Sequence, residues 1–505
     1  MSAAAASAGP APARTPLAAL LAIGLATAWA ALAVGHPGAT AAPVLAAALA
    51  WAAWKAPMRA SAGILVLLVL ALDGSENANG LWHSPLAPLG DLVHHSVQWI
   101  FPAARGIPLT GTEVAIALLL AAAAWRRSRG ERPAGPAAPP RAVAWVAGLY
   151  LGAIAVAAAV GVARGGSLEV AVWQTRPLLL TAALFFVFQA ALRGRFDEVH
   201  VGRIVVAAAL VRALLAAWVR WVVVPRSGAG FVEYATDHGD SMLFTVACAL
   251  VVAYLLERRG RARAWTAAVV LPVLLLGIQA NGRRTAWLQL ALGLLVFLVV
   301  ARGAAWRRQL GRAALAAAPL VLLYGLAGWS SEAAVFHPVR VVRSVVDATV
   351  DRSTWDRKVE DWNLAMSMRD HPLLGRGFGE EWTEYYRGDE VEQIFWRYKT
   401  QPHNQILGLL LFAGPLGFVG IWAPLALLVL VAVRAYPRAR NPEQRAAALA
   451  AAATALVVAV QCFSDLGPFW PQYAVLTALA LAAGGKLAGA TEGVPPRLGP
   501  GEPAT

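Results

Sequence analysis

Residues 401–422 read QPHNQILGLLLFAGPLGFVGIW, and this stretch sets the interpretation of the whole chain. A polar pair, His403 and Asn404, opens a long apolar segment directly after an extensive polar loop. An imidazole changes its protonation near neutral pH, so a histidine held where a bilayer meets water is suited to take a proton from a hydroxyl group. The stretch therefore predicts a membrane span that begins at a candidate general base.

The composition assigns the chain to the membrane proteins. Of its 505 residues, 58% are hydrophobic and only 14% are charged, and the mean hydropathy is +0.57. Apolar runs of about 20 residues, which a helix needs to cross a hydrocarbon core, recur from Thr15 to Lys486. We predict an all-α polytopic membrane protein with about 12–14 transmembrane helices and one large, partly helical periplasmic loop.

Fourteen segments have this apolar character, of which the third is the shortest. The predicted spans are Thr15–Val34, Ala39–Trp54, Ala60–Leu72, Gly111–Trp125, Ala142–Ala163, Val170–Leu192, Val201–Val224, Ser241–Glu257, Ala264–Ala280, Thr285–Ala301, Ala313–Trp329, Asn404–Val433, Ala446–Cys462 and Trp470–Gly485. They predict four parts: N-terminal transmembrane helices (1–329), a large periplasmic loop (330–401), C-terminal transmembrane helices (402–486) and a disordered cytoplasmic tail (487–505).

The basic residues predict the orientation of the chain. If every predicted span crosses once, 24 Lys and Arg residues lie on one side and five lie in the short loops opposite. The positive-inside rule makes the first side cytoplasmic, together with both termini. The 72-residue loop then lies outside, and its 13 acidic against 10 basic residues make it no polyanion-binding patch. The net charge of +14 thus reflects orientation rather than nucleic-acid binding.

The sequence offers little support for a disulfide or a metal site. Cys248 and Cys462 both fall inside predicted spans. The outer segment 73–110 contains three histidines and Asp91, but no ligand spacing repeats there, so interfacial histidines are the better interpretation.

The large loop has an internal organisation. Ser353–Met368 reads as a helix, with Ser353 or Thr354 as N-cap and with Trp355, Val359, Trp362 and either Ala365 or Met366 along one face. The following HPLLGRGFGEEW contains Gly375, Gly377 and Gly379, which permit a tight turn near a ligand. Its likeness to a dinucleotide fingerprint is spurious, because no strand precedes it and no helix follows.

Three separated pieces, RRTAWLQL, RDHPLLGRGFG and PHNQILGLLLFAGPLG, occur in the order seen in the O-antigen ligase and O-antigen polymerase family of bacterial membrane proteins. The chain resembles this family over roughly residues 240–435, with Arg284, Pro372–Gly379 and His403–Gly417 at the family's motif positions. Where many members have Ser-Arg, this chain has Arg283-Arg284, so either arginine is a candidate for the family role.

The resemblance implies transfer of a glycan from an undecaprenyl-pyrophosphate carrier, at the outer face of the bacterial inner membrane, to a glycan, lipid or protein acceptor. His403, Arg284 and Arg283 are the predicted catalytic residues. Arginine suits a pyrophosphate leaving group because its charge is permanent and its donors are bidentate. Inverting, metal-independent chemistry is implied by the resemblance, and the energy-rich donor bond makes a cofactor unnecessary.

Three arginines inside spans are further candidates for substrate binding, because an ionised side chain there is costly and usually faces a cavity or a partner. Arg176 and Arg220 lie near the outer ends of their spans, and Arg212 lies nearer the middle. A structural role is an equal alternative for all three, and for Arg220 that role is snorkelling to lipid headgroups. For Arg203, a fourth arginine within a span, snorkelling is the favoured interpretation.

The loop and the outer turns supply the other candidates for substrate binding, namely His371, Arg376, Asn404 and Asp465. Asn404 also suits a helix N-cap. Asp465 lies beside the helix breakers Gly467 and Pro468, so we expect its carboxylate to face the same cavity and to orient a histidine or an arginine, or to cap a helix.

Several residues have competing interpretations. His371, Glu380 and Glu381 are rivals of His403 for the role of base, although His371, before a proline, is better suited to shaping the turn. Capping is the default interpretation for Asp240. Four aromatic residues of the large loop suit either stacking on a sugar or anchoring at the membrane interface: Trp382, Tyr385, Tyr386 and Trp396.

The acceptor is open at this point. A ligase moves a finished glycan, a polymerase joins repeat units on the carrier, and a protein O-oligosaccharyltransferase uses a Ser or Thr side chain. A membrane transporter is the alternative from another class, because charged residues within spans can also mark ion pathways.

Overall fold

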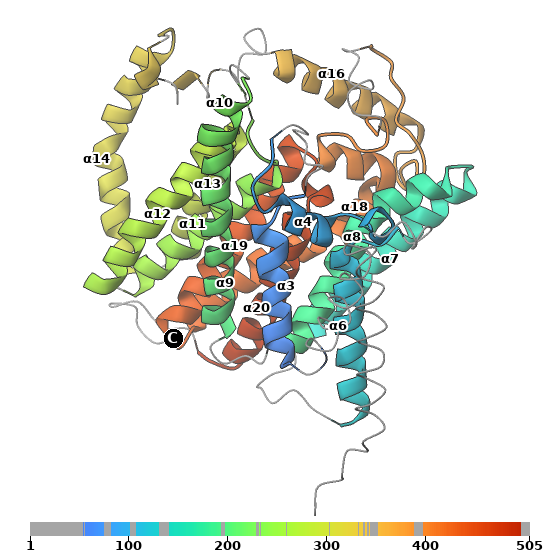
Figure 1. Cartoon of the computed structure of the whole chain (residues 1–505), viewed down its shortest axis with the longest axis horizontal. Helices are drawn as coiled ribbons and strands as arrows, with labels where there is room; N and C mark the ends of the chain where they lie inside the picture. Colours follow the sequence, from blue (N-terminus) through green and yellow to red (C-terminus); the bar gives the residue numbers. More distant parts are fainter. Residues whose placement is uncertain are drawn as a thin grey trace, which may run out of the picture.

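The computed structural model of the chain is a bundle of helices (Figure 1). The structure describes residues 54, 56–74, 82–100, 108–130, 141–192, 197–228, 232, 234–258, 260–301, 304–331, 333–336, 339, 340, 343, 352–387 and 397–495. No strand occurs among these residues. The predicted all-α class is therefore confirmed, while the first predicted span and nearly all of the second lie outside the described residues.

Most of the long helices follow the predicted spans to within a few residues, but α14 begins well before its predicted span and α20 extends beyond its own. They are α3 (Met58–Ala71), α4 (Ala87–His94), α5 (Val97–Ile100), α6 (Gly111–Ser128), α7 (Arg141–Ala163), α8 (Leu168–Ala191), α9 (Asp197–Trp218), α10 (Val224–Arg226), α11 (Gly239–Glu257), α12 (Arg261–Asn281), α13 (Arg284–Val300), α14 (Ala305–Gly328), α16 (Arg352–Ser367), α18 (Gln405–Ala435), α19 (Pro442–Ser464) and α20 (Pro471–Thr491). A π-helical stretch, Val219–Val223, joins α9 to α10. Within the described residues, nine helical segments are long and apolar enough to cross a membrane, and α3 and α13 are shorter apolar helices.

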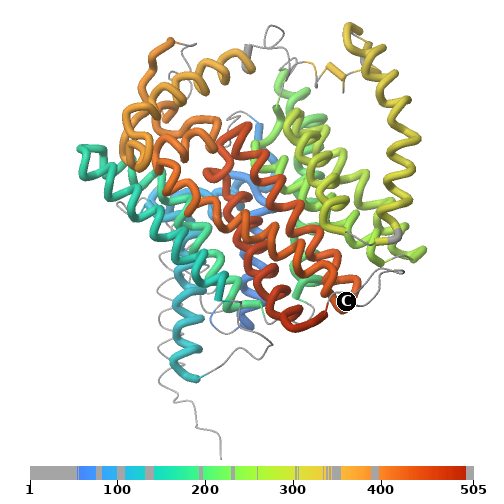
Figure 2. The backbone as a smooth tube through the Cα atoms, turned by 180° about the vertical axis from the view of Figure 1, so that it is seen from behind, coloured from blue at the N-terminus to red at the C-terminus, as the bar shows by residue number. Residues whose placement is uncertain are grey.

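The centre of the bundle is α19, which packs against α11, α13, α18 and α20. These helices occupy the middle of the molecule when it is seen from behind (Figure 2). Ala448, Ala452 and Ala453 on α19 are completely buried. Helices in a membrane gain little from the hydrophobic effect and associate through close packing, which small side chains allow. At the edge of the bundle, by contrast, the apolar stretch of α14 has no buried residue.

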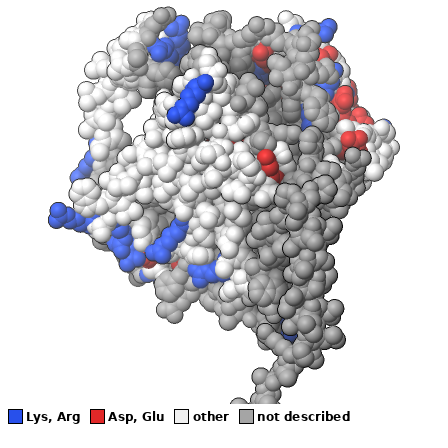
Figure 3. Space-filling view, in the orientation of Figure 1, with Lys and Arg blue, Asp and Glu red and all other residues white. Residues whose placement is uncertain are grey.

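The two ends of the bundle differ in character. We call one end the loop face; it is formed by residues 164–167, 234–239, 282–284, 352–387, 397–404 and 464–471. Contacts such as the Ser167 N–H to Gly379 O hydrogen bond, 2.9 Å, join these segments. We call the opposite end, with residues 257–263 and 434–445, the basic end. Lys and Arg gather along the lower left edge of Figure 3, toward the basic ends of α11 and α12.

A break in α18 anchors the large loop. Gly414 has φ 66° and ψ 172°, and Pro415 follows it. Proline has no N–H, so the carbonyl of Leu411 loses its partner four residues ahead. The N–H of Arg376 donates to Leu411 O at 2.8 Å instead, and the N–H of Gly377 donates to Phe412 O at 2.8 Å. The loop turn thereby satisfies two carbonyls that the helix break leaves open.

The glycines of this turn allow its close approach to the bundle. Gly375, Gly377 and Gly379 all have positive φ. A Cβ on Gly377 would lie 2.1 Å from the backbone nitrogen of Gly161 in α7, and one on Gly375 would lie 2.4 Å from that of Gly414. The predicted tight turn is confirmed, and its glycines pack backbone against backbone.

We predict that Gly414→Ala destabilises the protein. Its φ of 66° with ψ of 172° is a conformation essentially restricted to glycine, which costs a residue with a Cβ about 1–3 kcal/mol. The Cβ would also meet Leu373 O at 2.3 Å. Gly311→Ala is the matched control, because Gly311 in α14 has no neighbour within 4 Å of the added atom and alanine is the better helix former. Thermal unfolding in detergent should show a lower Tm for Gly414→Ala only; equal Tm values would contradict the packing argument.

Candidate functional site

His403 is bound by a buried carboxylate of the loop helix α16. Glu360 is 2% exposed. Its Oε1 accepts the backbone N–H of His403 at 2.5 Å, and its Oε2 lies 2.9 Å from Nδ1 of the ring. A carboxylate at Nδ1 favours the tautomer that carries its proton there, which leaves the lone pair on Nε2. The ring is 27% exposed, so the geometry suits a proton acceptor at the surface.

The next residue of each segment, Asn404 after His403 and Asp361 after Glu360, forms a second contact between α18 and α16. Asn404 is the N-cap of α18 and accepts the N–H of Leu407 at 3.2 Å, which confirms its capping role. Burial raises the pKa of Asp361 to about 6, although a hydrogen bond with Asn404 works in the opposite direction. Glu360 and Asp361, adjacent on α16, thus bind His403 and Asn404, the two residues that precede α18.

Arg283 and Arg284 occupy the turn between α12 and α13. Gly282 ends α12 in the left-handed conformation, with φ 77°, and Arg283 is the N-cap of α13. The Arg283 guanidinium lies over the ring of Tyr234, 3.9 Å from its centroid. Arg283 is 7% exposed, while Arg284 is half-buried. Stacking on an aromatic face attracts a guanidinium and fixes its orientation.

A second histidine–carboxylate pair lies beside this turn. Nδ1 of His238 contacts Oδ2 of Asp465, and its ring stacks on Trp470, 5.4 Å between centroids at 10°. Burial lowers the pKa of His238, and the positive charges of Arg283, His403 and Arg357 lower it further. Because Arg283 and His403 both act on the charge of His238, the α12–α13 turn, His403 and this pair lie in one region of the loop face.

Arg212 binds three carboxylates inside the bundle. It is 1% exposed and lies 3.0 Å from Asp73, 2.9 Å from Asp240 and 3.8 Å from Asp237. The default capping interpretation of Asp240 is wrong, because its carboxylate pairs with Arg212 and His238 is the N-cap of α11 without a side-chain cap bond. The cluster ties α9 to the segment that carries His238.

Four other predicted residues are engaged by the protein itself. Arg176 binds Glu113, with Nε 2.5 Å from Oε1, and Arg220 donates to Val232 O. Arg376 donates to Glu381 O at 2.6 Å and lies 3.2 Å from Asp370. His371 is half-buried, and its carbonyl accepts the Gly375 N–H at 3.1 Å.

The packed face of α16 differs from the prediction. Trp355 and Trp362 are 51% and 48% exposed, whereas Glu360, Asn363 and Ser367 are buried. Val359 is buried as predicted, and Leu364 is buried too. Asn363 and Ser367 bind the backbone of residues 383–386, so apolar and polar groups share this interface. The helix begins at Arg352, which puts Ser353 and Thr354 in its first turn rather than at the N-cap.

The aromatic candidates separate by exposure. Trp382 is 2% exposed and its indole donates to Tyr398 O at 3.0 Å, so it has no face for a sugar and that interpretation is wrong. Tyr385 and Tyr386 are 49% and 55% exposed. Trp396 lies outside the described residues.

Sequence reasoning missed His238, Glu360 and Asp361. His238 has the same signature as His403, a histidine between a polar loop and an apolar span, and this repetition was the available signal. No comparable signal marks Glu360, because a carboxylate on a polar helix is usually exposed.

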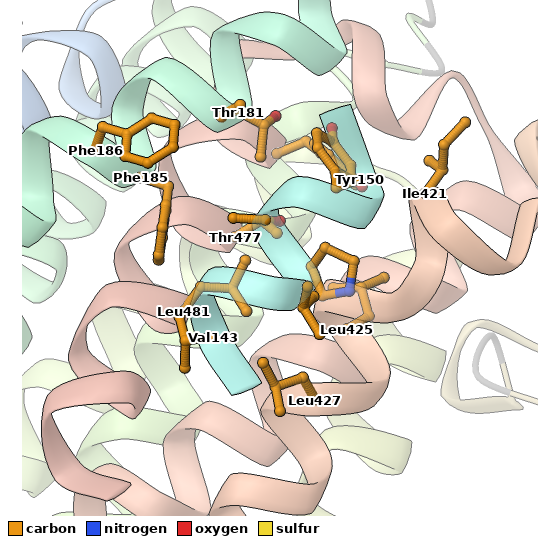
Figure 4. Close-up of a pocket in the computed structure, with 15 residues that line it drawn as sticks. Val143, Tyr150, Thr181, Phe185, Phe186, Ile421, Leu425, Leu427, Thr477 and Leu481 are labelled. Atoms are coloured by element: carbon orange, nitrogen blue, oxygen red, sulfur yellow. The ribbon is translucent and has the colours of Figure 1, made fainter. Parts of the chain in front are cut away.

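A small cavity elsewhere carries no chemistry. It has a volume of about 40 Å³ and lies among α7, α8, α18 and α20, with Val143, Phe185 and Leu425 in its wall (Figure 4). No charged side chain lines it. No group of three or more metal-binding side chains occurs among the described residues.

We predict that Arg212→Met lowers stability by about 3–5 kcal/mol, because it leaves buried carboxylates unpaired. Arg434→Met, at an exposed arginine of α18, is the control and should change Tm little. Adding Asp240→Asn to Arg212→Met should recover part of the loss, since one buried charge is removed. A Tm of Arg212→Met equal to that of the control would rule out this role.

We predict a pH-dependent stability difference for Asp361→Asn. The pKa of Asp361 is raised to about 6 from 3.8, so the folded state binds the proton more tightly than the unfolded state. Its contribution to stability therefore falls as pH rises from 3.8 to about 6. The Tm of Asp361→Asn relative to the unchanged protein should rise across this window and level off above it. Parallel Tm curves would contradict the prediction.

One comparison with known proteins finds a family match. No curated protein matches the chain. Residues 267–422 match the family model Wzy_C, described as O-Antigen ligase. The match runs from α12 through the Arg283-Arg284 turn, α16 and the glycine turn to His403 and the first half of α18. This multi-span membrane protein therefore carries, over residues 267–422, a domain of the O-antigen ligase family.

Proposed function

We propose that the protein transfers a glycan from an undecaprenyl-pyrophosphate-linked donor to an acceptor hydroxyl, with inverting and metal-independent chemistry. The observation that carries the proposal is the His403–Glu360 pair, with a buried carboxylate at Nδ1 and a partly exposed ring. The family match supports ligase- or polymerase-type glycan transfer. The identity of the donor, the inversion at the anomeric carbon and the roles of the site residues are what we propose.

In the proposed reaction, Nε2 of His403 accepts the proton of the acceptor hydroxyl. The oxygen attacks the anomeric carbon as the bond between that carbon and the pyrophosphate oxygen breaks. The leaving group is undecaprenyl pyrophosphate, which takes the bonding electron pair. Glu360 keeps the ring in the required tautomer and stabilises the imidazolium that forms.

The arginine turn serves the leaving group. Arg283 and Arg284 supply permanent positive charge where the diphosphate develops its additional negative charge. Burial and stacking hold Arg283 in place before the substrate arrives. A preorganised cation stabilises developing charge without reorganisation during the reaction, which favours Arg283 as the closer contact.

The pair His238–Asp465 is proposed as a positioning element. Burial and neighbouring cations lower the pKa of His238, and Asp465 at Nδ1 together with Trp470 fixes the position of its ring. Tyr234, on which Arg283 stacks, lies 6.3 Å from the His238 ring. The proposed role of Asp465 is therefore to orient His238, which it contacts.

The proposed setting is the bacterial inner membrane, with the loop face in the periplasm and both termini in the cytoplasm. The excess of basic residues on the opposite side supports this orientation. Of the three acceptor classes, a polymerase leaves a longer glycan on the carrier, a ligase moves the glycan to a final acceptor, and a protein O-oligosaccharyltransferase labels Ser or Thr. Product analysis separates them.

We predict that His403→Ala lowers transfer by roughly 10²–10⁴-fold, the usual contribution of a general base. Purified protein, labelled lipid-linked donor, candidate envelope acceptors and a chelator would be combined, and released glycan measured. Glu360→Gln should lose less, because the ring remains. The anomeric configuration of the product, read by NMR, tests inversion.

A second set of variants removes the positive charge of Arg283 and Arg284 and is measured in the same transfer assay. Arg283→Ala with Arg284→Ala should abolish transfer, whereas Arg308→Ala, at an exposed arginine near the start of α14, should leave it unchanged. Full activity in the double variant would remove the electrostatic part of the proposal.

Transfer by His403→Ala equal to that of the unchanged protein would show that another residue is the base, and loss of transfer in the presence of chelator would contradict metal independence. If no acceptor is labelled, solute flux in vesicles tests the transporter alternative.

A further inference from the structure

A cavity of about 590 Å³ lies in the half of the bundle away from the loop face. Its walls come from α9, α11, α12, α19 and α20. On α11, which begins at the loop face with Gly239, the lining residues run from Val246 to Leu255. The volume is that of a ligand site, and no residue of the candidate glycan-transfer site lines it.

Small side chains create this space. On α19 the wall includes Ala446, Ala447, Ala450 and Ala451, and on α20 it includes Ala480, Ala483 and Gly484. Valines and leucines of α9 and α11 form much of the rest. Such walls offer few polar partners, and buried water needs two to four of them. An apolar occupant therefore fits the interior.

Charged residues stand at the basic end of the cavity. Arg203 of α9 and Arg263 of α12 both line it, as do Glu198 and Glu443. Glu443 is paired with Arg258. Counting that partner, three arginines face two carboxylates, so the entrance carries a net positive charge. Basic entrances between transmembrane helices at the cytoplasmic side suit the headgroups of anionic lipids.

We propose that this cavity binds an anionic phospholipid. An acyl chain occupies the apolar interior between α9 and the alanine wall, and the headgroup phosphate contacts Arg203 and Arg263. A peptide segment fits poorly, because its backbone groups would lack partners among these walls. The proposal requires only that the bundle spans a membrane, so its outcome is independent of the proposed glycan transfer.

The test measures lipid binding directly. Purified full-length protein, delipidated in detergent, would be titrated with phosphatidylglycerol or with phosphatidylcholine of the same acyl chains, and bound lipid counted by native mass spectrometry. We expect preferential binding of phosphatidylglycerol, and a rise in Tm that follows its concentration, because a ligand of the folded state stabilises it.

Two kinds of variant locate the site. Arg203→Ala with Arg263→Ala should weaken phosphatidylglycerol binding by roughly tenfold to thirtyfold, as expected for two arginines at a headgroup. Arg308→Ala with Arg312→Ala removes the same charge from exposed positions of α14 and should change binding little. Ala447→Phe, which fills the interior, should reduce binding of both lipids, and the two arginine pairs keep the test valid if this variant does not fold.

Three results would overturn the proposal. One is equal binding of the two lipids, which would leave only a generic acyl-chain contact. Another is an equal effect of the two arginine pairs, which would leave only general surface charge. The third is copurification of a neutral isoprenoid, or dimerisation through this face, in place of an anionic phospholipid.

Discussion

The break in α18 is the constraint on which the loop face depends. Pro415 cannot donate a hydrogen bond, so the carbonyl of Leu411 needs another partner in a region where water is scarce. The N–H of Arg376 provides it, and glycines on both sides let the backbones meet. Because this turn follows α16 directly, its position limits where α16 can lie. The buried Glu360 and its contacts with His403 follow from that placement.

Two histidine–carboxylate pairs share the loop face but differ in their surroundings. Glu360 binds both the ring and the backbone of His403, whose side chain is 27% exposed. His238 is stacked on Trp470 and close to positive charges that lower its pKa. Both rings have a carboxylate at Nδ1. The ring stacked on Trp470 suits the role of a support, and the more exposed ring of His403 suits proton transfer. The buried Arg212 cluster stabilises the segment in which His238 lies.

The sequence predicted some of the site because parts of it are local. His403, the Asn404 cap and the Arg283-Arg284 turn lie at boundaries between polar and apolar segments, which are visible without a fold. Glu360 was missed because its partner is 43 residues away and because a carboxylate on a loop helix is usually exposed. The face of α16 was predicted only in part: Val359 is buried as expected, but the exposed Trp355 and Trp362 resemble core residues, and buried polar side chains share the packed face.

The sequence by itself determined the helical class, the positions of the spans and the bias of basic residues toward one side. These follow from hydrophobicity and charge counted along the chain, and a membrane leaves the backbone few alternatives to a helix. Only the tertiary structure decided which charges meet: Arg212 with three aspartates, His238 with Asp465 and His403 with Glu360. Such pairs join residues far apart in the chain, and their geometry depends on how whole helices pack, which no local pattern encodes.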